Sequence, residues 1–405
     1  MANAHDHLRT TFSRRRFLTR SVAGATATAA MASFMLPGIT EPVFASSLHT
    51  MNAQIGPVDP RRRMVLGHDI STLQQLEAVG KTFSDDGRVR PAEEILARHG
   101  ATYIRQRLWV NPPMPYDDFP HLLSMARRVK RAGLKFLVDF HYSDFWADPG
   151  KQNTPQAWQG QDLSTLATTV YTYTRHVIKA LADQRTPADM VQIGNEVTAG
   201  MLWPQGQIYV NGTQRWAEFT TLLKAGIAGA RDGSPPFHDL RVMVHIDRGG
   251  DNGGSRWFYD HILAQNVNFD IIGLSYYPWW HGPLSALQAN LQDLAPRYGK
   301  DIVIAETAYP WTFADGDGYA NSVNSQTALQ TSYPATPQGQ LGFMRNVISL
   351  LEQTPNNHGL GVMYWEPAWI PGVGWEPGAG DAWDNMTLFD FNGRALPSIN
   401  IYQGS

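Results

Sequence analysis

Two glutamates, Glu196 and Glu306, each follow or close a short apolar run that reads as a β-strand. Two carboxyl groups that face each other can hydrolyse a glycosidic bond: one protonates the leaving oxygen, and the other attacks the anomeric carbon or activates water. A separation of roughly 5 Å would give retention of configuration through a covalent sugar–enzyme ester. Mutual repulsion would keep one carboxyl protonated while the other stays ionised.

The elements that must position these glutamates are eight apolar runs that alternate with amphipathic stretches. The predicted strands are residues 64–70, 103–109, 135–140, 190–195, 241–245, 271–276, 302–306 and 361–365, and the predicted helices include 118–132, 162–183, 214–231, 255–265, 284–297 and 337–352. Alternating strands and helices imply parallel pairing. We therefore predict an α/β protein with a single (β/α)8 TIM barrel over residues 63–405. An open doubly wound sheet is the alternative, which the lack of a Gly-rich nucleotide loop after the first strand disfavours.

A barrel predicts that functional side chains lie at the C-terminal ends of its strands. Chemically useful residues occupy all eight ends: Asp69, Arg105 or Arg107, Asp139 with His141, Asn195 with Glu196, His245, Tyr276 with Tyr277, Glu306, and Trp365 with Glu366. Strands four and seven lie on opposite sides of a barrel mouth, so Glu196 and Glu306 would face each other. Arg105 and Arg107 share one side of their strand. The spacing therefore leaves open which of them enters the pocket.

Composition excludes several other classes of function. The 405-residue chain has a formal net charge of −3 and no concentrated basic face, which argues against nucleic-acid binding. It has no cysteine, which excludes disulfides, thiolate nucleophiles and cysteine-ligated metals. His141 and His245 lack the His-x-x-x-His spacing of a zinc site, so hydrogen bonding to a sugar is preferred. Many aromatic residues stand beside Gly, Pro and polar residues, as in surfaces that stack on sugars.

The N-terminus has the pattern of an export signal. Arginines at 14–16 precede Phe17 and Leu18, an Ala-rich apolar run covers residues 22–39, and residues 43–45 offer small side chains for cleavage. This order resembles a twin-arginine signal. We expect residues 1–45 to be a signal peptide and residues 46–62 an N-terminal extension, with delivery to the periplasm or outside the cell and no membrane attachment after cleavage. An uncleaved membrane anchor is the alternative.

Several longer segments make the resemblance specific. They are residues 67–71, 105–112, 139–150, 194–204, 275–278 and 306–311, and the fullest of them includes HYSDFWADPG. Together they resemble glycoside hydrolase family 53, the arabinogalactan endo-β-1,4-galactanases, over residues 64 to 398. Asn-Glu after strand four and Glu ending strand seven are similar to the wider clan of retaining barrel glycosidases.

The resemblance implies internal cleavage of β-1,4-galactan, the polysaccharide side chain of pectin, with no cofactor for the chemistry. It implies that Glu196 is the acid/base and Glu306 the nucleophile. The implied substrate-binding residues are Arg107, Arg105, Asp69, His141, Asn195, His245, Tyr276, Trp311, Trp365 and Trp146. Alternatives are another β-1,4-linked polysaccharide (mannan, xylan or glucan) and a non-catalytic sugar-binding barrel. We expect a monomer.

A polar segment after the seventh predicted strand spaces oxygen ligands at every second residue. Asp315, Asp317 and Asn321 are the candidate ligands of a structural calcium ion. Bacterial members of the family are similar in this respect, although Tyr319 stands where the family pattern has His. A Gly-rich turn without metal is an equal alternative.

Overall fold

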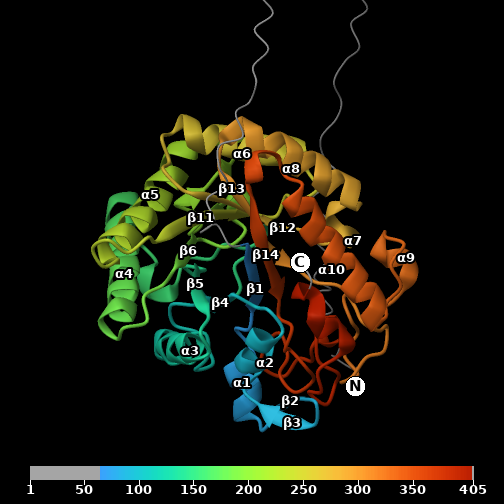
Figure 1. The fold of residues 1–405 in the computed structure, drawn as a ribbon. Helices are drawn as coiled ribbons and strands as arrows, with labels where there is room; N and C mark the ends of the chain where they lie inside the picture. Colours follow the sequence, from blue (N-terminus) through green and yellow to red (C-terminus); the bar gives the residue numbers. More distant parts are fainter. Residues whose placement is uncertain (1–63, 404–405) are drawn as a thin grey trace, which may run out of the picture. The chain divides into compact units, whose positions relative to one another are not determined.

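A computed structural model describes residues 64–403, and its centre is a closed barrel of eight parallel strands (Figure 1). The strands are β1 (Val65–Asp69), β4 (Tyr103–Leu108), β5 (Lys135–Phe140), β6 (Met190–Ile193), β11 (Arg241–Ile246), β12 (Ile271–Ser275), β13 (Asp301–Thr307) and β14 (Gly359–Trp365). β1 pairs with both β14 and β4, which closes the sheet. The TIM-barrel prediction is confirmed, and closure excludes the open sheet.

Helices surround this barrel (Figure 1). They are α1 (Leu73–Ala78), α2 (Ala92–Arg98), α3 (Phe119–Arg131), α4 (Leu163–Asp183), α5 (Trp216–Gly233), α6 (Asn252–Ala264), α7 (Pro278–His281), α8 (Leu284–Tyr298), α9 (Gln326–Leu329) and α10 (Pro337–Glu352). α3 shows why they form. Asp118 accepts a hydrogen bond from the His121 N–H at the first turn, and Leu122, Met125, Ala126 and Val129 bury one stripe at helical spacing.

Three short two-stranded sheets that the sequence pattern did not predict stand outside the barrel. They pair β2 (Phe83–Asp85) with β3 (Arg88–Arg90), β7 (Gly200–Met201) with β8 (Gly206–Gln207), and β9 (Tyr209–Val210) with β10 (Thr213–Gln214). Helices α1 and α2 were also missed. All of these elements are short, and short elements carry too few residues for a clear period.

The barrel interior has an apolar floor and a polar layer above it. Ten buried residues form the floor: Val65, Tyr103, Leu137, Met190, Met243, Ile271, Val303, Ala305, Leu360 and Met363. Side chains alternate along a strand, so an inward residue recurs every second position. Continuing that parity from the floor leads to Arg105, Asp139, Gln192 and His245, all fully or almost fully buried. The fold therefore places a charged layer over a closed hydrophobic core.

Two predictions concern residues outside the described part. The expected signal peptide, residues 1–45, and the expected extension, residues 46–62, lie outside the described residues. Within residues 64–403, no helix combines the length and the apolarity needed to cross a bilayer.

Candidate active site

Glu306 lies near the C-terminal end of β13 between a cation and a phenol. Its Oε1 accepts a hydrogen bond from Arg105 Nη2 at 3.0 Å, and its Oε2 accepts one from the Tyr277 hydroxyl at 3.3 Å. The Glu306 side chain is 8% exposed. A positive charge at this distance favours the ionised carboxylate, and an ionised carboxylate is what a nucleophile requires.

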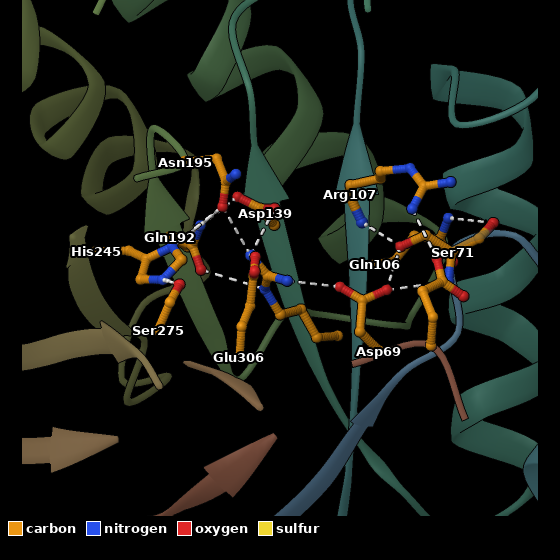
Figure 2. A network of polar contacts seen from close by, with 12 residues as sticks. Asp69, Ser71, Gln106, Arg107, Asp139, Gln192, Asn195, His245, Ser275 and Glu306 are labelled. Carbon is orange, nitrogen blue, oxygen red and sulfur yellow. Dashed lines mark hydrogen bonds and ion pairs between the residues drawn. The ribbon is translucent and has the colours of Figure 1, made fainter. Parts of the chain in front are cut away.

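Arg105 connects four strand ends through Asp69, Asp139, Asn195 and Glu306. Figure 2 labels these four partners. Arg105 Nη1 lies 2.7 Å from Asp69 Oδ2, and its Nη2 lies 2.8 Å from Asp139 Oδ2 and 2.9 Å from Asn195 Oδ1. Its Nε donates to Gln192 Oε1. Burial opposes the charge of Arg105, but Asp139, Glu306 and Asp69 outweigh burial, so the pKa of Arg105 lies above its ordinary value. The guanidinium is thus held as a fixed cation beside Glu306.

Glu196 follows β6 in a left-handed backbone conformation, with φ 45° and ψ 52°. A non-glycine residue rarely adopts this conformation, and it occurs where surrounding structure fixes it. Gly194, two residues before Glu196, has φ 80°, and β6 ends before it at Ile193, whereas the predicted strand ran to residue 195. The two bends place the Glu196 carboxylate where Oε1 accepts a hydrogen bond from Ser275 Oγ at 2.7 Å.

The two candidate catalytic glutamates are linked through Ser275 at the end of β12. Its hydroxyl donates to Glu196, and its Cα pairs in register with Glu306 across a β-bulge. A second link runs from Glu306 through Arg105 to the side chain of Asn195, next to Glu196 in the chain. The structure therefore brings Glu196 and Glu306 to one polar centre, as the positions of their strands predicted.

Arg107 is held elsewhere than Arg105. Its Nη1 lies 2.6 Å from Glu366 Oε1, its Nε lies 2.9 Å from Asp117 Oδ2, and its guanidinium carbon stands 4.3 Å from the ring centre of Trp146. Burial raises the pKa of both carboxyls, and Arg107 opposes that rise. These contacts leave Arg105 as the arginine that contacts Glu306.

The two candidate histidines orient their neighbours. His141 Nε2 lies 3.0 Å from Asp139 Oδ2, and its Nδ1 faces the indole N–H of Trp109 at 3.2 Å. His245 Nε2 lies 2.9 Å from Ser275 Oγ. Both rings belong to the polar layer that holds Arg105 and Glu196.

The paired tyrosines after β12 point in different directions. The Tyr276 hydroxyl donates to the Gly282 carbonyl at 2.9 Å, and its ring stacks against Phe343. Tyr277, which sequence reasoning noted but did not select, contacts Glu306. Side chains alternate along a strand, so the sequence could have distinguished the two tyrosines only if the end of β12 were known to within one residue. A β-bulge at Leu274 and Ser275 shifts the register there, so the alternation could not be extrapolated.

Tryptophans gather beside the polar centre. The Trp365 ring is stacked at 25° on Trp375, with centres 5.8 Å apart, and stands edge-on to Trp383 at 4.9 Å. The Trp146 indole N–H donates to the Trp375 carbonyl. Trp311 differs: its indole N–H donates to Thr387 and its ring lies near Phe391. Trp146 and Trp365 therefore share one aromatic cluster, whereas Trp311 contacts Thr387 and Phe391 in a neighbouring segment.

The acidic loop after β13 lies beside a further candidate metal ligand, Asp384, which the sequence pattern did not indicate. Carboxylate oxygens of Asp315, Asp317 and Asp384 lie within 4.8 Å of one another. Asp384 Oδ1 and Asn321 Oδ1 are buried and lack a hydrogen-bond partner. Burial, together with Asp317 and Asp315, raises the pKa of Asp384 to about 6. Asp384 lies some seventy positions along the chain, so no local spacing could have indicated it.

Comparison with known proteins agrees with this geometry. The sequence model of glycosyl hydrolase family 53 matches residues 65–402. The chain belongs to that family. It is 34% identical over 344 residues to the arabinogalactan endo-beta-1,4-galactanase of Thermothelomyces thermophilus, covering 83% of this chain and 98% of that one. It is 42% identical over 341 residues to a protein of Niallia circulans described as "Uncharacterized protein in bgaB 5'region", covering 83% and 92%.

Solved structures of the same family superpose closely. The family 53 catalytic domain of Ignisphaera aggregans is 36% identical with a TM-score of 0.79, covering 84% of this chain and 95% of that one. A fungal beta-1,4-galactanase structure is 33% identical with a TM-score of 0.74, covering 85% and 100%. A xylanase A catalytic core at 15% identity and a TM-score of 0.53 shares the fold alone. Family membership makes the chain a glycoside hydrolase with a polysaccharide substrate.

Proposed function

We propose that this family 53 enzyme hydrolyses β-1,4-galactan within the polymer, with Glu306 as nucleophile and Glu196 as acid/base. The observation that carries the proposal is the contact of Arg105 and Tyr277 with the two oxygens of Glu306. Opposite charge keeps this carboxylate ionised, whereas Glu196 accepts a hydrogen bond from the neutral hydroxyl of Ser275. An opposite charge stabilises the ionised form more strongly than a neutral hydroxyl does, so the carboxyl with the lower pKa is expected at Glu306, as nucleophile and acid require.

The reaction then follows in two displacements. A Glu306 oxygen bonds to the anomeric carbon while the glycosidic bond breaks, and Glu196 gives its proton to the leaving oxygen. Water next attacks the same carbon, the ester to Glu306 breaks, and Glu196 takes back a proton from the water. Each step inverts the anomeric carbon, so the product retains the configuration of the substrate.

The substrate assignment rests on relatives. Several relatives are named as endo-β-1,4-galactanases, among them the protein of Thermothelomyces thermophilus and the Endo-beta-1,4-galactanase of Bacillus subtilis, which is 32% identical over 382 residues. The cluster around Trp365 and Trp146 gives the site the apolar surface on which a sugar face can stack. Mannan, xylan and glucan are the competing substrates.

Three measurements test the proposal. Purified enzyme should shorten linear galactan from within and leave xylan, mannan and cellulose intact, and proton NMR should show the β-anomer first. Glu306→Ala should lose turnover by several orders of magnitude while it still binds galacto-oligosaccharides in calorimetry. Azide should rescue Glu196→Ala to a β-galactosyl azide and Glu306→Ala to an α-galactosyl azide. Hydrolysis of xylan but not galactan would reject the substrate, and parental activity of Glu306→Ala would reject the nucleophile.

We propose further that the loop after β13 binds a structural calcium ion. Calcium takes six to eight oxygen ligands, and carboxylates with amide oxygens suit it. Asp315, Asp317 and Asp384 would supply carboxylates and Asn321 its buried Oδ1. The ion would tie the loop after β13 to the segment around Asp384 and would take no part in the bond cleavage.

We also propose export by the twin-arginine route. The pattern of Arg14, Arg15 and Phe17 before an apolar run supports it. Replacing Arg14 and Arg15 with lysine should leave the full-length precursor inside the cells, as detected by fractionation. Export unchanged by this replacement would reject the route.

A further inference from the structure

Ser275 lies at a place where one side chain can act on the acid/base. It is fully buried at the end of β12, and its hydroxyl has a single proton, which it donates to Glu196 Oε1 at 2.7 Å. Ser275 Oγ also lies 2.9 Å from His245 Nε2. Because the single hydroxyl proton of Ser275 is used in the hydrogen bond to Glu196, the contact of Ser275 Oγ with His245 requires an N–H on Nε2.

The other side of the imidazole faces one acceptor and two donors. His245 Nδ1 lies 3.0 Å from Asn195 Oδ1, which can only accept, and 3.1 Å from Gln192 Nε2 and 3.4 Å from the backbone N–H of Glu196, which can donate. The contacts of Nδ1 therefore fit both a bare and a protonated nitrogen. The Gln192 amide is oriented in turn, because its oxygen accepts from Arg105 Nε and its nitrogen donates to Asp139 Oδ1. The proton on His245 Nε2 therefore follows from the contacts of Ser275, and it is present in the Nε2–H tautomer and in the imidazolium alike.

We propose that Ser275, oriented by His245, is a positioning residue that holds the Glu196 carboxyl by Oε1 and biases it toward the ionised form. This inference rests on the proposed acid/base role of Glu196. With Oε1 engaged as an acceptor, the proton transferred to the leaving oxygen is carried on Oε2. The serine thereby fixes which oxygen of Glu196 acts in both displacements.

The sign of the pH effect follows from the direction of the hydrogen bond. A donor to an ionised carboxylate stabilises the charged form. Removing the Ser275 hydroxyl should make Glu196 keep its proton to higher pH. Charged groups on the neighbouring elements are the same in parent and variant: Arg105 of β4, Asp139 of β5, His245 and Asp247 on and after β11, and Glu306 of β13.

The test compares Ser275→Ala with the parent across pH. The alkaline limb of kcat/KM on galactan, which reports loss of the Glu196 proton, should move up by about one pH unit, as a hydrogen bond to a charged group implies. Ser275→Thr, which keeps the hydroxyl, should return the limb toward its parental position. An unmoved alkaline limb in Ser275→Ala would overturn the proposal.

A second readout separates proton transfer from general damage. Galactan needs a proton on its leaving oxygen, whereas a dinitrophenyl β-galactobioside does not. Ser275→Ala should lose about tenfold more kcat/KM on galactan than on the dinitrophenyl substrate. The matched control is Ser255→Ala, which removes another buried hydroxyl, bonded to the Arg248 carbonyl outside the site. Equal losses of Ser275→Ala on both substrates would indicate a purely structural role.

His245 variants keep the proposal testable if Ser275→Ala folds poorly. Gln in place of His245 can donate from the Nε2 position and should keep the parental alkaline limb, whereas His245→Leu should shift it as Ser275→Ala does. A Gln variant that shifts as far as the Leu variant would contradict the orienting role. Failure of the acid/base assignment itself would be seen separately, as undiminished hydrolysis of galactan by Glu196→Ala.

Discussion

Two arginines on one strand show how much a displacement of two residues changes a side chain's role. Arg105 and Arg107 both project from the same face of β4, but Arg105 pairs with Asp69, Asp139 and Glu306, whereas Arg107 pairs with Asp117 and Glu366. Arg105 lies within the barrel layer that contains Asp139 and Glu306. Arg107 is one pleat nearer the mouth, where Glu366 and the Trp146 ring hold it. Two arginines on the same face of one strand thus have different ion-pair partners.

Lysine replacements of these arginines should therefore have different kinetic effects. Lysine keeps the charge but loses the planar fork that reaches several acceptors at once. Arg105→Lys should lower kcat on galactan by about 100-fold or more with a smaller change in KM, because Glu306 loses its oriented partner. Arg107→Lys should act mainly on KM, because it loosens Trp146. Steady-state kinetics on galactan measure both values.

The comparison is matched, since both variants keep the charge and stand on one strand. Thermal melts of the two proteins would show whether folding contributes. A larger loss of kcat in Arg107→Lys than in Arg105→Lys would contradict the conclusion that Arg105 is the partner of the nucleophile Glu306.

What could be predicted at this scale depended on local pattern. Glu196, Glu306 and Asn195 follow or close apolar runs, so their positions at the polar centre followed from sequence. Ser275 and Gln192 are neutral residues, and only the closed barrel brings them to Glu196 and Arg105. Asp384 belongs to a segment remote in sequence from the acidic loop that it approaches. Gln192 did carry a signal, because it stands two residues after Met190 of the barrel floor.

At the scale of elements, the strand order and the longer helices were predictable, and the strand ends were not. Periodicity over ten or more residues specified α3, α4 and α10. The bulge between β12 and β13, and the left-handed residue after β6, depend on contacts across the barrel. Those irregularities coincide with Ser275 and Glu196, so the site lies where the regular pattern stops.

The N-terminus of α3 offers a test of how an element is specified. Asp118 Oδ1 accepts a hydrogen bond from the His121 backbone N–H at 3.0 Å and lies 2.6 Å from Nδ1 of the same residue. Asp118→Ala removes this cap and should lower the free energy of unfolding by about 1 kcal/mol, and Asp118→Asn, which can still cap, should lose less. Urea unfolding followed by circular dichroism measures both. Equal losses for Ala and Asn would show that the cap contributes nothing.

At the scale of the whole molecule, the proposed calcium site predicts that stability depends on calcium and pH together. Burial raises the pKa of Asp384 to about 6 in the folded protein, above its ordinary value. Without metal, the stability from this group is fully present below about pH 4 and is lost as pH rises through about 6. Calcium needs the ionised carboxylate, so its stabilising effect should have the opposite pH dependence.

We expect the rise in melting temperature caused by calcium to be small at pH 5 and larger at pH 7. Differential scanning fluorimetry with calcium, with magnesium and with chelator measures it. Asp384→Asn should abolish most of the rise, whereas Asp183→Asn, which alters an exposed ion pair on α4, should not. A melting temperature indifferent to calcium at pH 7 would mean that the loop is a metal-free turn.

The hydrophobic floor beneath the charged layer also has a consequence for how a polymer travels. Ten side chains plug the tube from below, so a chain cannot thread through the barrel. A long substrate must instead lie across the open end, and both severed fragments depart on the side by which the strand arrived. Such a site can grip a polymer at any point along its length and has no need of a free terminus.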